Sequence, residues 1–250
     1  MLVRNGTARL VALILGTWIP SAIAPIDVSA QRAPESAEVL ARLERGDIRS
    51  INIRSAFEMD GNYARYTDGE RQQFLDALER IARGGADQSA RDAAFTELSL
   101  IARSPRTTAL QAQEIPSRLI RIYEQTTIRE SKWDAIYNLG RVLRTSPRES
   151  PQITRLLVLL IKQPVTTRET IEGAQQYQTE TVASYQALDA LFSACDVAVP
   201  VLRQLYAERV AIPDDETRAR IEEAADQGFD PARFDLSTGW QGIPGTSLCG

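Results

Sequence analysis

A helical phrase occurs twice in the middle of this chain. Residues 91–98 read RDAAFTEL, and 41 positions later residues 132–139 read KWDAIYNL. In both copies a basic residue is followed by an alanine and then a leucine, and apolar side chains recur at the spacing of one helical face. A self-similarity with a period near 40 predicts stacked pairs of helices. We therefore expect an all-α fold.

Short signals mark where the first helices begin and end. Thr67 and Glu70 have the spacing of a capping box, in which a hydroxyl and a carboxylate bind each other's free backbone amides. An apolar stripe from Phe74 to Ala82 follows at helical spacing. The next helices are expected to run up to Gly84-Gly85, from Ser89 to Ser104-Pro105, from Ile115-Pro116, and up to Ser146-Pro147.

The later helices carry weaker signals. The segment from Ser150-Pro151 to Ile161 is apolar nearly all round, which predicts a central, buried helix. Thr166 and Glu169 repeat the capping-box spacing, and Asp196 is expected to cap a further helix. A last, weaker helix is expected over residues 214–226.

The repeated phrase resembles the second helix of HEAT-like and armadillo-like repeats, in which a basic residue, an Ala and a Leu stand in this order. Pro200–Leu205 also matches the Pro-x-Leu-x-x-Leu pattern of a first helix, and Pro116–Leu119 matches it loosely. The resemblance covers residues 67–227 and implies a right-handed α-solenoid of about four helical hairpins with a concave protein-binding surface. An irregular helical bundle is the alternative.

The spacing of the repeat changes before the third unit. Leu139 and Leu188 are separated by 49 positions instead of 41, which indicates an insertion around residues 172–180. The sequence leaves open whether this insertion is a longer helix or a loop that serves a partner.

The ends of the chain differ from the repeat region. Residues 1–30 have the order of a bacterial-type secretory signal, with Arg4 and Arg9 before an apolar stretch and an expected cleavage site after Ala30. An uncleaved anchor is the alternative. Residues 31–66 are expected to be a lead-in with a short helix, and residues 228–250 an irregular tail with several glycines and prolines. We therefore expect a periplasmic or extracellular protein.

Composition excludes several kinds of chemistry. The chain has no histidine, which excludes His-dependent nucleophile systems and His-ligated metals, and it has no phosphate-binding glycine motif. The net charge of −4 is unfavourable for nucleic-acid binding. No membrane span is expected after signal removal, and no cofactor or metal is expected.

Cys195 and Cys249 are expected to pair in an oxidising compartment, with free thiols or a redox pair as alternatives.

Few residues are candidates for function. The acidic run from Asp214 to Glu216 is explained by the dipole at a helix start, and we expect no catalytic residue there. Tyr63, Tyr66 and Tyr177 are candidates for partner binding, or alternatively for local packing. We expect an exported, non-catalytic scaffold or adaptor that binds another protein. The alternatives are a carboxylate-dependent hydrolase that acts on envelope or extracellular polymers, and a purely structural envelope component.

Overall fold

The structure is a computed structural model, and it describes the following residues: 35–48, 53, 57, 66–84, 87–104, 109–145, 150–163, 167–169, 177–179, 182–234 and 249. The chain divides into two units, Met1–Arg32 and Ala33–Gly250. The first unit, which holds the expected signal peptide and its cleavage site, lies outside the described residues. All that follows concerns the second unit.

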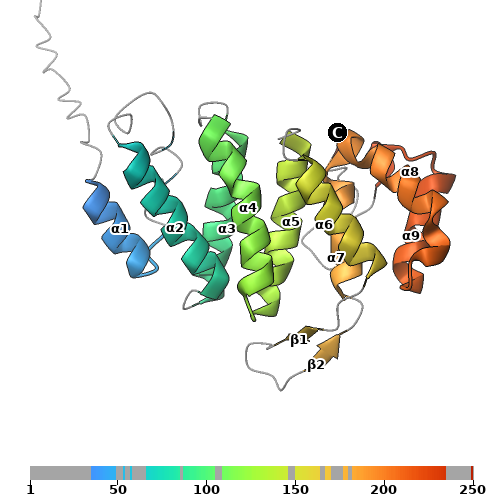
Figure 1. Ribbon diagram of the computed structural model, residues 1–250, viewed down its shortest axis with the longest axis horizontal. Coiled ribbons are helices and arrows are strands. Elements are labelled where there is room, and N and C mark those ends of the chain that lie inside the picture. The colour runs from blue at the N-terminus through green and yellow to red at the C-terminus, as the bar shows by residue number, and fades with distance from the viewer. Residues whose placement is uncertain are drawn as a thin grey trace, which may run out of the picture. The chain divides into compact units, whose positions relative to one another are not determined.

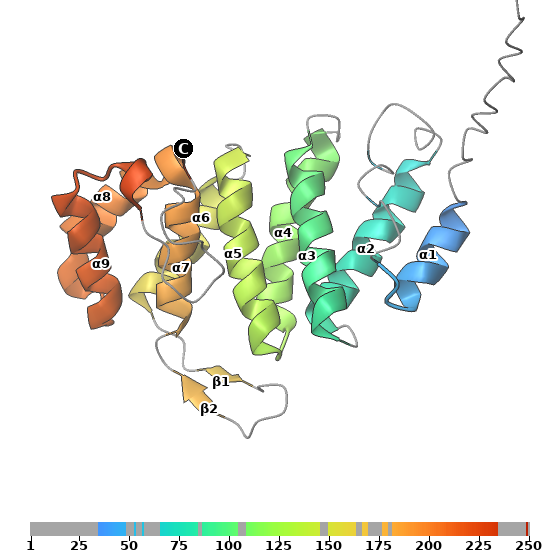
Figure 2. The same cartoon turned by 180° about the vertical axis from the view of Figure 1, so that it is seen from behind.

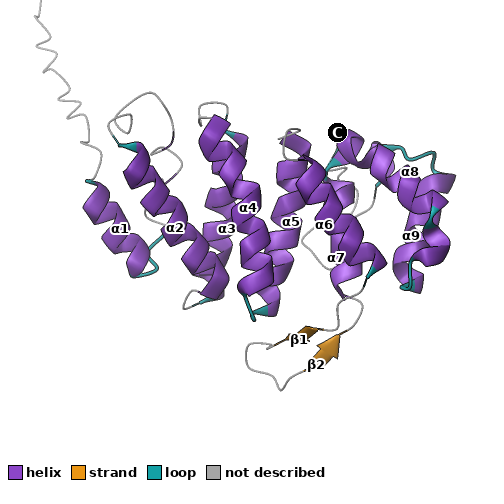
Figure 3. Ribbon diagram, in the orientation of Figure 1, coloured by secondary structure: helices purple, strands orange, loops and turns teal. Residues whose placement is uncertain are grey.

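The described residues are almost entirely helical, so the all-α prediction is confirmed (Figure 3). None of the helices among them is both long and apolar enough to cross a membrane. Short 3₁₀ segments lie around the last helices: η2 Cys195–Ala198, η3 Arg209–Ala211 and η4 Pro231–Arg233. The helices are α1 Ser36–Glu44, α2 Asp68–Gly84, α3 Gln88–Arg103, α4 Ala109–Gln125, α5 Arg129–Thr145, α6 Ser150–Lys162, α7 Val182–Ser193, α8 Val199–Ala207 and α9 Asp215–Asp226.

Consecutive helices pair and lie in two layers. Helices α2, α4 and α6 form one layer, and α3, α5 and α7 form the other (Figures 1 and 2). Within each pair the helices pack on each other, and in the second layer α5 packs between α3 and α7. We call α2, α4 and α6 the first-helix layer, and α3, α5 and α7 the second-helix layer.

Several hydrogen bonds that join the first two pairs have the same sequence separation, and others have separations of 39 and 43 residues. Gln72 donates to Glu114 at 2.7 Å, Arg83 to Gln125 at 2.6 Å and Arg121 to Glu79 at 2.9 Å, and each bond spans 42 residues. Burial raises the pKa of Glu79, but hydrogen bonds and charges from Arg121 and Arg118 outweigh it, and the net pKa is lowered. Because α2 and α4 meet at nearly the period of the repeated phrase, equivalent positions of the two pairs face each other.

The capping box at the start of α2 is confirmed. The backbone N–H of Thr67 donates to Glu70 Oε2 at 2.7 Å, and the N–H of Glu70 donates to Thr67 Oγ1 at 3.2 Å. The two side chains thus satisfy amides that have no partner inside the helix. The cap of α3 is Asp87, whose side chain accepts a hydrogen bond from Ala90 N at 2.7 Å. This cap lies two residues before Ser89, where the sequence predicted the start of the helix.

Three helix signals are wrong. Helix α4 begins at Ala109, so Pro116 lies inside it and not in its first turn, because the good helix formers before Pro116 extend the helix backwards. Glu169 lies in a strand and caps no helix. Asp196 caps no helix, because it lies inside η2 (Cys195–Ala198), and the N-cap position of α8 is Ala198.

Helix α6 is not buried on all sides. Ile153, Leu157 and Ile161 are fully buried, but 47% of the Leu159 surface is exposed, because α6 lies in the first-helix layer with one side open. The prediction of a central, fully buried α6 is therefore wrong.

Two short strands are described in the segment before α7. Strands β1 Thr167–Glu169 and β2 Tyr177–Thr179 pair antiparallel, with Arg168 opposite Gln178. Figure 1 shows the two strands between α6 and α7, beyond the helix ends. The described part of the insertion expected over residues 172–180 is thus neither helix nor loop but the strand β2, which pairs with β1 before it.

Candidate functional site

A stripe of arginine and aromatic side chains runs along α5. Arg129, Trp133, Tyr137 and Arg141 recur every four residues, so they lie on neighbouring turns of one side of the helix. The Arg129 guanidinium lies 3.9 Å from the centre of the Trp133 ring, and that of Arg141 lies 5.8 Å from the Tyr137 ring. All four side chains are partly buried and partly exposed. Trp, Tyr and Arg in such a position are the residue types that dominate binding hot spots. We call these four residues the α5 stripe.

An arginine outside the α5 stripe, Arg220, joins α9 to α7. Arg220 of α9 donates to Asp189 at 2.8 Å, and its guanidinium lies 4.5 Å from the Tyr185 ring and 5.1 Å from the Phe192 ring. Phe192 in turn stacks on Phe234 at 4.8 Å. These contacts are mostly buried, so they fix α9 against the second-helix layer and do not form an open site.

A buried carboxyl lies between α3 and α5. Only 7% of the Asp134 surface is exposed, and burial raises its pKa to about 7, with further increases from Asp92, which is within hydrogen-bonding reach, and from Glu130. The charge of Arg91, itself only 2% exposed, lowers it. Such a group exchanges its proton near neutral pH. It is closed to substrate, unlike the acids of a glycoside hydrolase, which are about 5–10 Å apart across an open cleft.

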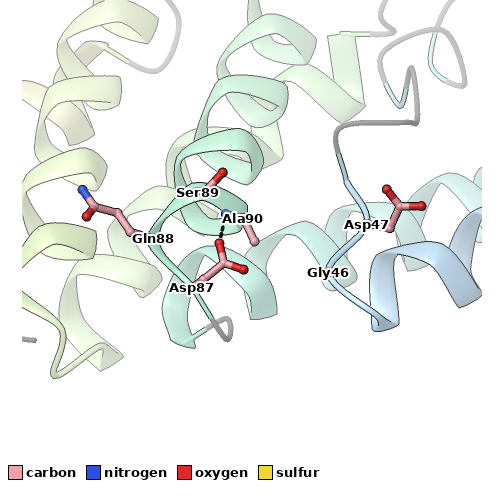
Figure 4. A pocket seen from close by; sticks show the side chains of 6 residues that line it. All are labelled: Gly46, Asp47, Asp87, Gln88, Ser89 and Ala90. Atoms are coloured by element: carbon pink, nitrogen blue, oxygen red, sulfur yellow. Dashed lines mark hydrogen bonds between the residues drawn. The ribbon is translucent and has the colours of Figure 1, made fainter.

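A shallow hollow lies beside the start of α3. It measures about 530 Å³ and is lined by Gly46 and Asp47, which follow α1, and by residues 87–90. Figure 4 shows that the Asp87 side chain turns back to bond Ala90 N, while Gln88 points away from Gly46. The cap therefore occupies an amide that an anion would need, and Asp47 adds a second negative charge. The hollow is not a built anion site.

The residues singled out from the sequence do not meet in one place. Tyr66 is only 4% exposed and packs edge-on against Phe74 at 5.4 Å, so it takes the packing role that the sequence left open. Tyr177 lies in the strand β2, and Tyr63 lies outside the described residues. Tyr177 stays a candidate on its position alone.

Cys195 and Cys249 form a disulfide, as expected, with a Cα–Cα distance of 5.6 Å. The bond ties the end of the chain to the turn after α7, and Cys249 Sγ also lies 3.7 Å from the carbonyl of Phe192. A disulfide of this kind is compatible with an exported protein.

The acidic run before α9 has a structural role. Asp214 caps α9 by accepting from Thr217 N at 2.8 Å, and Asp215 pairs with Arg218. Across the described residues, no three acidic or sulfur side chains are grouped to hold a metal ion.

The α5 stripe was not among the candidates taken from the sequence, because helical spacing alone does not show which aromatic side chains of a helix stay partly exposed. The signal was present in the four-residue spacing of Arg129, Trp133, Tyr137 and Arg141. Comparison of the chain with protein-family models, curated proteins and solved structures finds no match.

Proposed function

We propose that the chain is an exported, non-catalytic scaffold that binds another protein through its second-helix layer. In this proposal the helix pairs continue as a right-handed α-solenoid of the HEAT-like type. The separation of 42 residues that recurs between bonded positions of α2 and α4 supports a repeating stack. Stacks of this kind offer long continuous surfaces that suit protein recognition.

The α5 stripe carries the proposal. Its aromatic rings are held in place by stacked guanidinium groups, so binding costs little side-chain ordering, and a planar donor stands at each end. Helix α5, which carries the stripe, lies in the middle of the second-helix layer, with α3 and α7 on either side (Figure 2). A partner that lies across this layer contacts all three helices.

Site-specific photo-crosslinking in the native host tests the proposal. A photoreactive residue at position 137 is expected to capture one protein, whereas the same residue at Arg155, exposed on α6 in the opposite layer, is expected not to capture it. Trp133→Ala is expected to weaken capture without loss of helical signal. Equal capture from both positions, or none from position 137, contradicts the proposal. Export is tested separately by the mass of the mature chain, which is expected to start at Gln31.

A further inference from the structure

The two seams of the second-helix layer differ in chemistry. Between α5 and α7 the backbones lie very close, because a Cβ placed on Gly140 would be 2.5 Å from Ser193 Oγ and 2.7 Å from the carbonyl carbon of Ala190. Between α3 and α5 the contact is polar, with Arg91 and Asp134 buried in it. The α5–α7 seam is therefore tight, whereas the α3–α5 seam holds charge.

Other polar groups on the same side of α5 are incompletely satisfied. Ser131 and Asn138 lie three positions before and four positions after Asp134, which places all three on one face of the helix. Both are at least 96% buried, and among the described residues the Ser131 hydroxyl and the Asn138 Oδ1 have no hydrogen-bond partner. Opening this seam would return such groups to water, so its closure is less favourable than that of an apolar seam.

The charges that act on Asp134 come from the two sides of this seam. Asp92 and Arg91 face it from α3, and Glu130 lies one turn away on α5. Charged groups on the other neighbours of α5 are engaged elsewhere: Arg118 and Arg121 of α4 bind Glu79, Lys162 of α6 binds Glu208, and Asp189 of α7 binds Arg220. Asp92 is itself exposed, so the proton on Asp134 decides whether the one buried carboxyl of the seam is charged beside Arg91 and next to the carboxylate of Asp92.

We propose that the α3–α5 seam is a proton-operated joint, closed while Asp134 carries a proton and opened when Asp134 loses it beside the carboxylate of Asp92. The joint concerns the free protein, so it does not depend on the proposed partner. Because α3 and α5 both belong to the second-helix layer, its opening changes the surface on which the α5 stripe lies.

The direction of the pH dependence follows from the raised pKa of Asp134. The closed seam holds its proton up to a pKa of about 7, whereas an exposed aspartate has a pKa near 3.8. Closure of the seam is therefore most favourable at acid pH. It weakens as the pH rises from the pKa of the exposed aspartate to that of the buried Asp134, and it does not change above that pH. The window includes neutral pH.

Hydrogen–deuterium exchange of the full-length oxidised protein tests the joint. With exchange times corrected for the intrinsic effect of pH, protection in α3 and α5 is expected to fall about a hundredfold from about pH 5 to about pH 8.5, whereas α8 is expected to stay protected. Asp134→Asn, which mimics the protonated side chain, is expected to abolish the pH dependence. Asp92→Asn is expected to reduce it, because it removes the facing carboxylate.

Three outcomes overturn the joint. They are constant protection of α3 and α5 across this range, an equal loss in α8, and a pH dependence that persists in Asp134→Asn. If Asp134→Asn does not fold, the contrast between α3–α5 and α8 in the unmodified protein, together with the exposed Asp92→Asn, decides the question. None of these measurements requires a partner, so a failure here is separate from a failure of the proposed scaffold function.

Discussion

Replacing Gly140 with alanine tests whether the α5–α7 seam is as tight as the structure shows. The new methyl group would lie 2.5 Å from Ser193 Oγ and 2.7 Å from the Ala190 carbonyl carbon, and closer still to the carbonyl oxygen. Favourable carbon contacts need about 3.5–4 Å, so the helices must separate by roughly 1 Å. The obstacle at Ala190 is backbone, so a rotamer change cannot relieve it.

Two opposing effects determine how much stability Gly140→Ala loses. Overpacking of this kind typically costs about 1–3 kcal/mol, and we expect the upper end because α7 must move as a unit. Alanine gains roughly 0.5–1 kcal/mol over glycine inside a helix, which offsets part of the cost. The net loss is about 2 kcal/mol, and for a chain of this size it lowers the melting temperature by roughly 4–8 °C.

Thermal and urea denaturation followed by circular dichroism measure this loss. Gly69→Ala in the first turn of α2 is the matched control, because the nearest atom to its new Cβ is Thr67 Oγ1 at 4.0 Å. The same substitution is expected to leave stability unchanged or raise it there. A melting temperature for Gly140→Ala at or above that of the unmodified protein would refute the close approach of α5 and α7.

Further predictions concern the acid group, the disulfide and the cap. The free energy of unfolding is expected to fall by up to about 1.4 kcal/mol per pH unit between the exposed and buried pKa values of Asp134, and to show no such slope in Asp134→Asn when urea unfolding is measured across that range. Reduction of Cys195–Cys249, or its replacement by two serines, is expected to cost at most about 4 kcal/mol, because the bond closes a separation of 54 residues. Non-reducing mass measurement checks that the bond lies within one chain, and a dimer would contradict it. Thr67→Ala is expected to cost about 1 kcal/mol in the same unfolding assay, whereas Thr67→Ser, which keeps the hydroxyl, is expected to cost little.

Local patterns predicted the parts of this fold that depend on neighbours in sequence. The box of Thr67 and Glu70 forms within four residues, and the stripe after it buries Phe74 and Leu78 as its spacing predicts. The same signals failed where packing decides. Glu169 has capping-box spacing but pairs in a strand opposite Tyr177, a partner that lies beyond the reach of a helix pattern.

The candidate site was harder to predict than the fold. Residue spacing predicts which side chains share one side of α5. Which of these side chains stay exposed depends on how far α3 and α7 cover that side. Trp133 and Tyr137 were therefore not among the candidates from the sequence, whereas Tyr66, offered as a binding residue, packs in the core. Asp134 stands inside the repeated phrase, yet its unusual environment comes from Arg91 and Asp92 of the preceding helix pair.

The bonds between neighbouring helix pairs bear on how the chain reaches this structure. A chain whose contacts join adjacent helix pairs can fold progressively from its N-terminal side as it is synthesised. The bonds from α2 to α4 need only the segment up to Gln125. Cys249, by contrast, lies 54 residues after Cys195, so their bond needs a segment of chain that includes α8 and α9. In a chain that folds from its N-terminal side, α2 and α4 therefore dock before the disulfide closes.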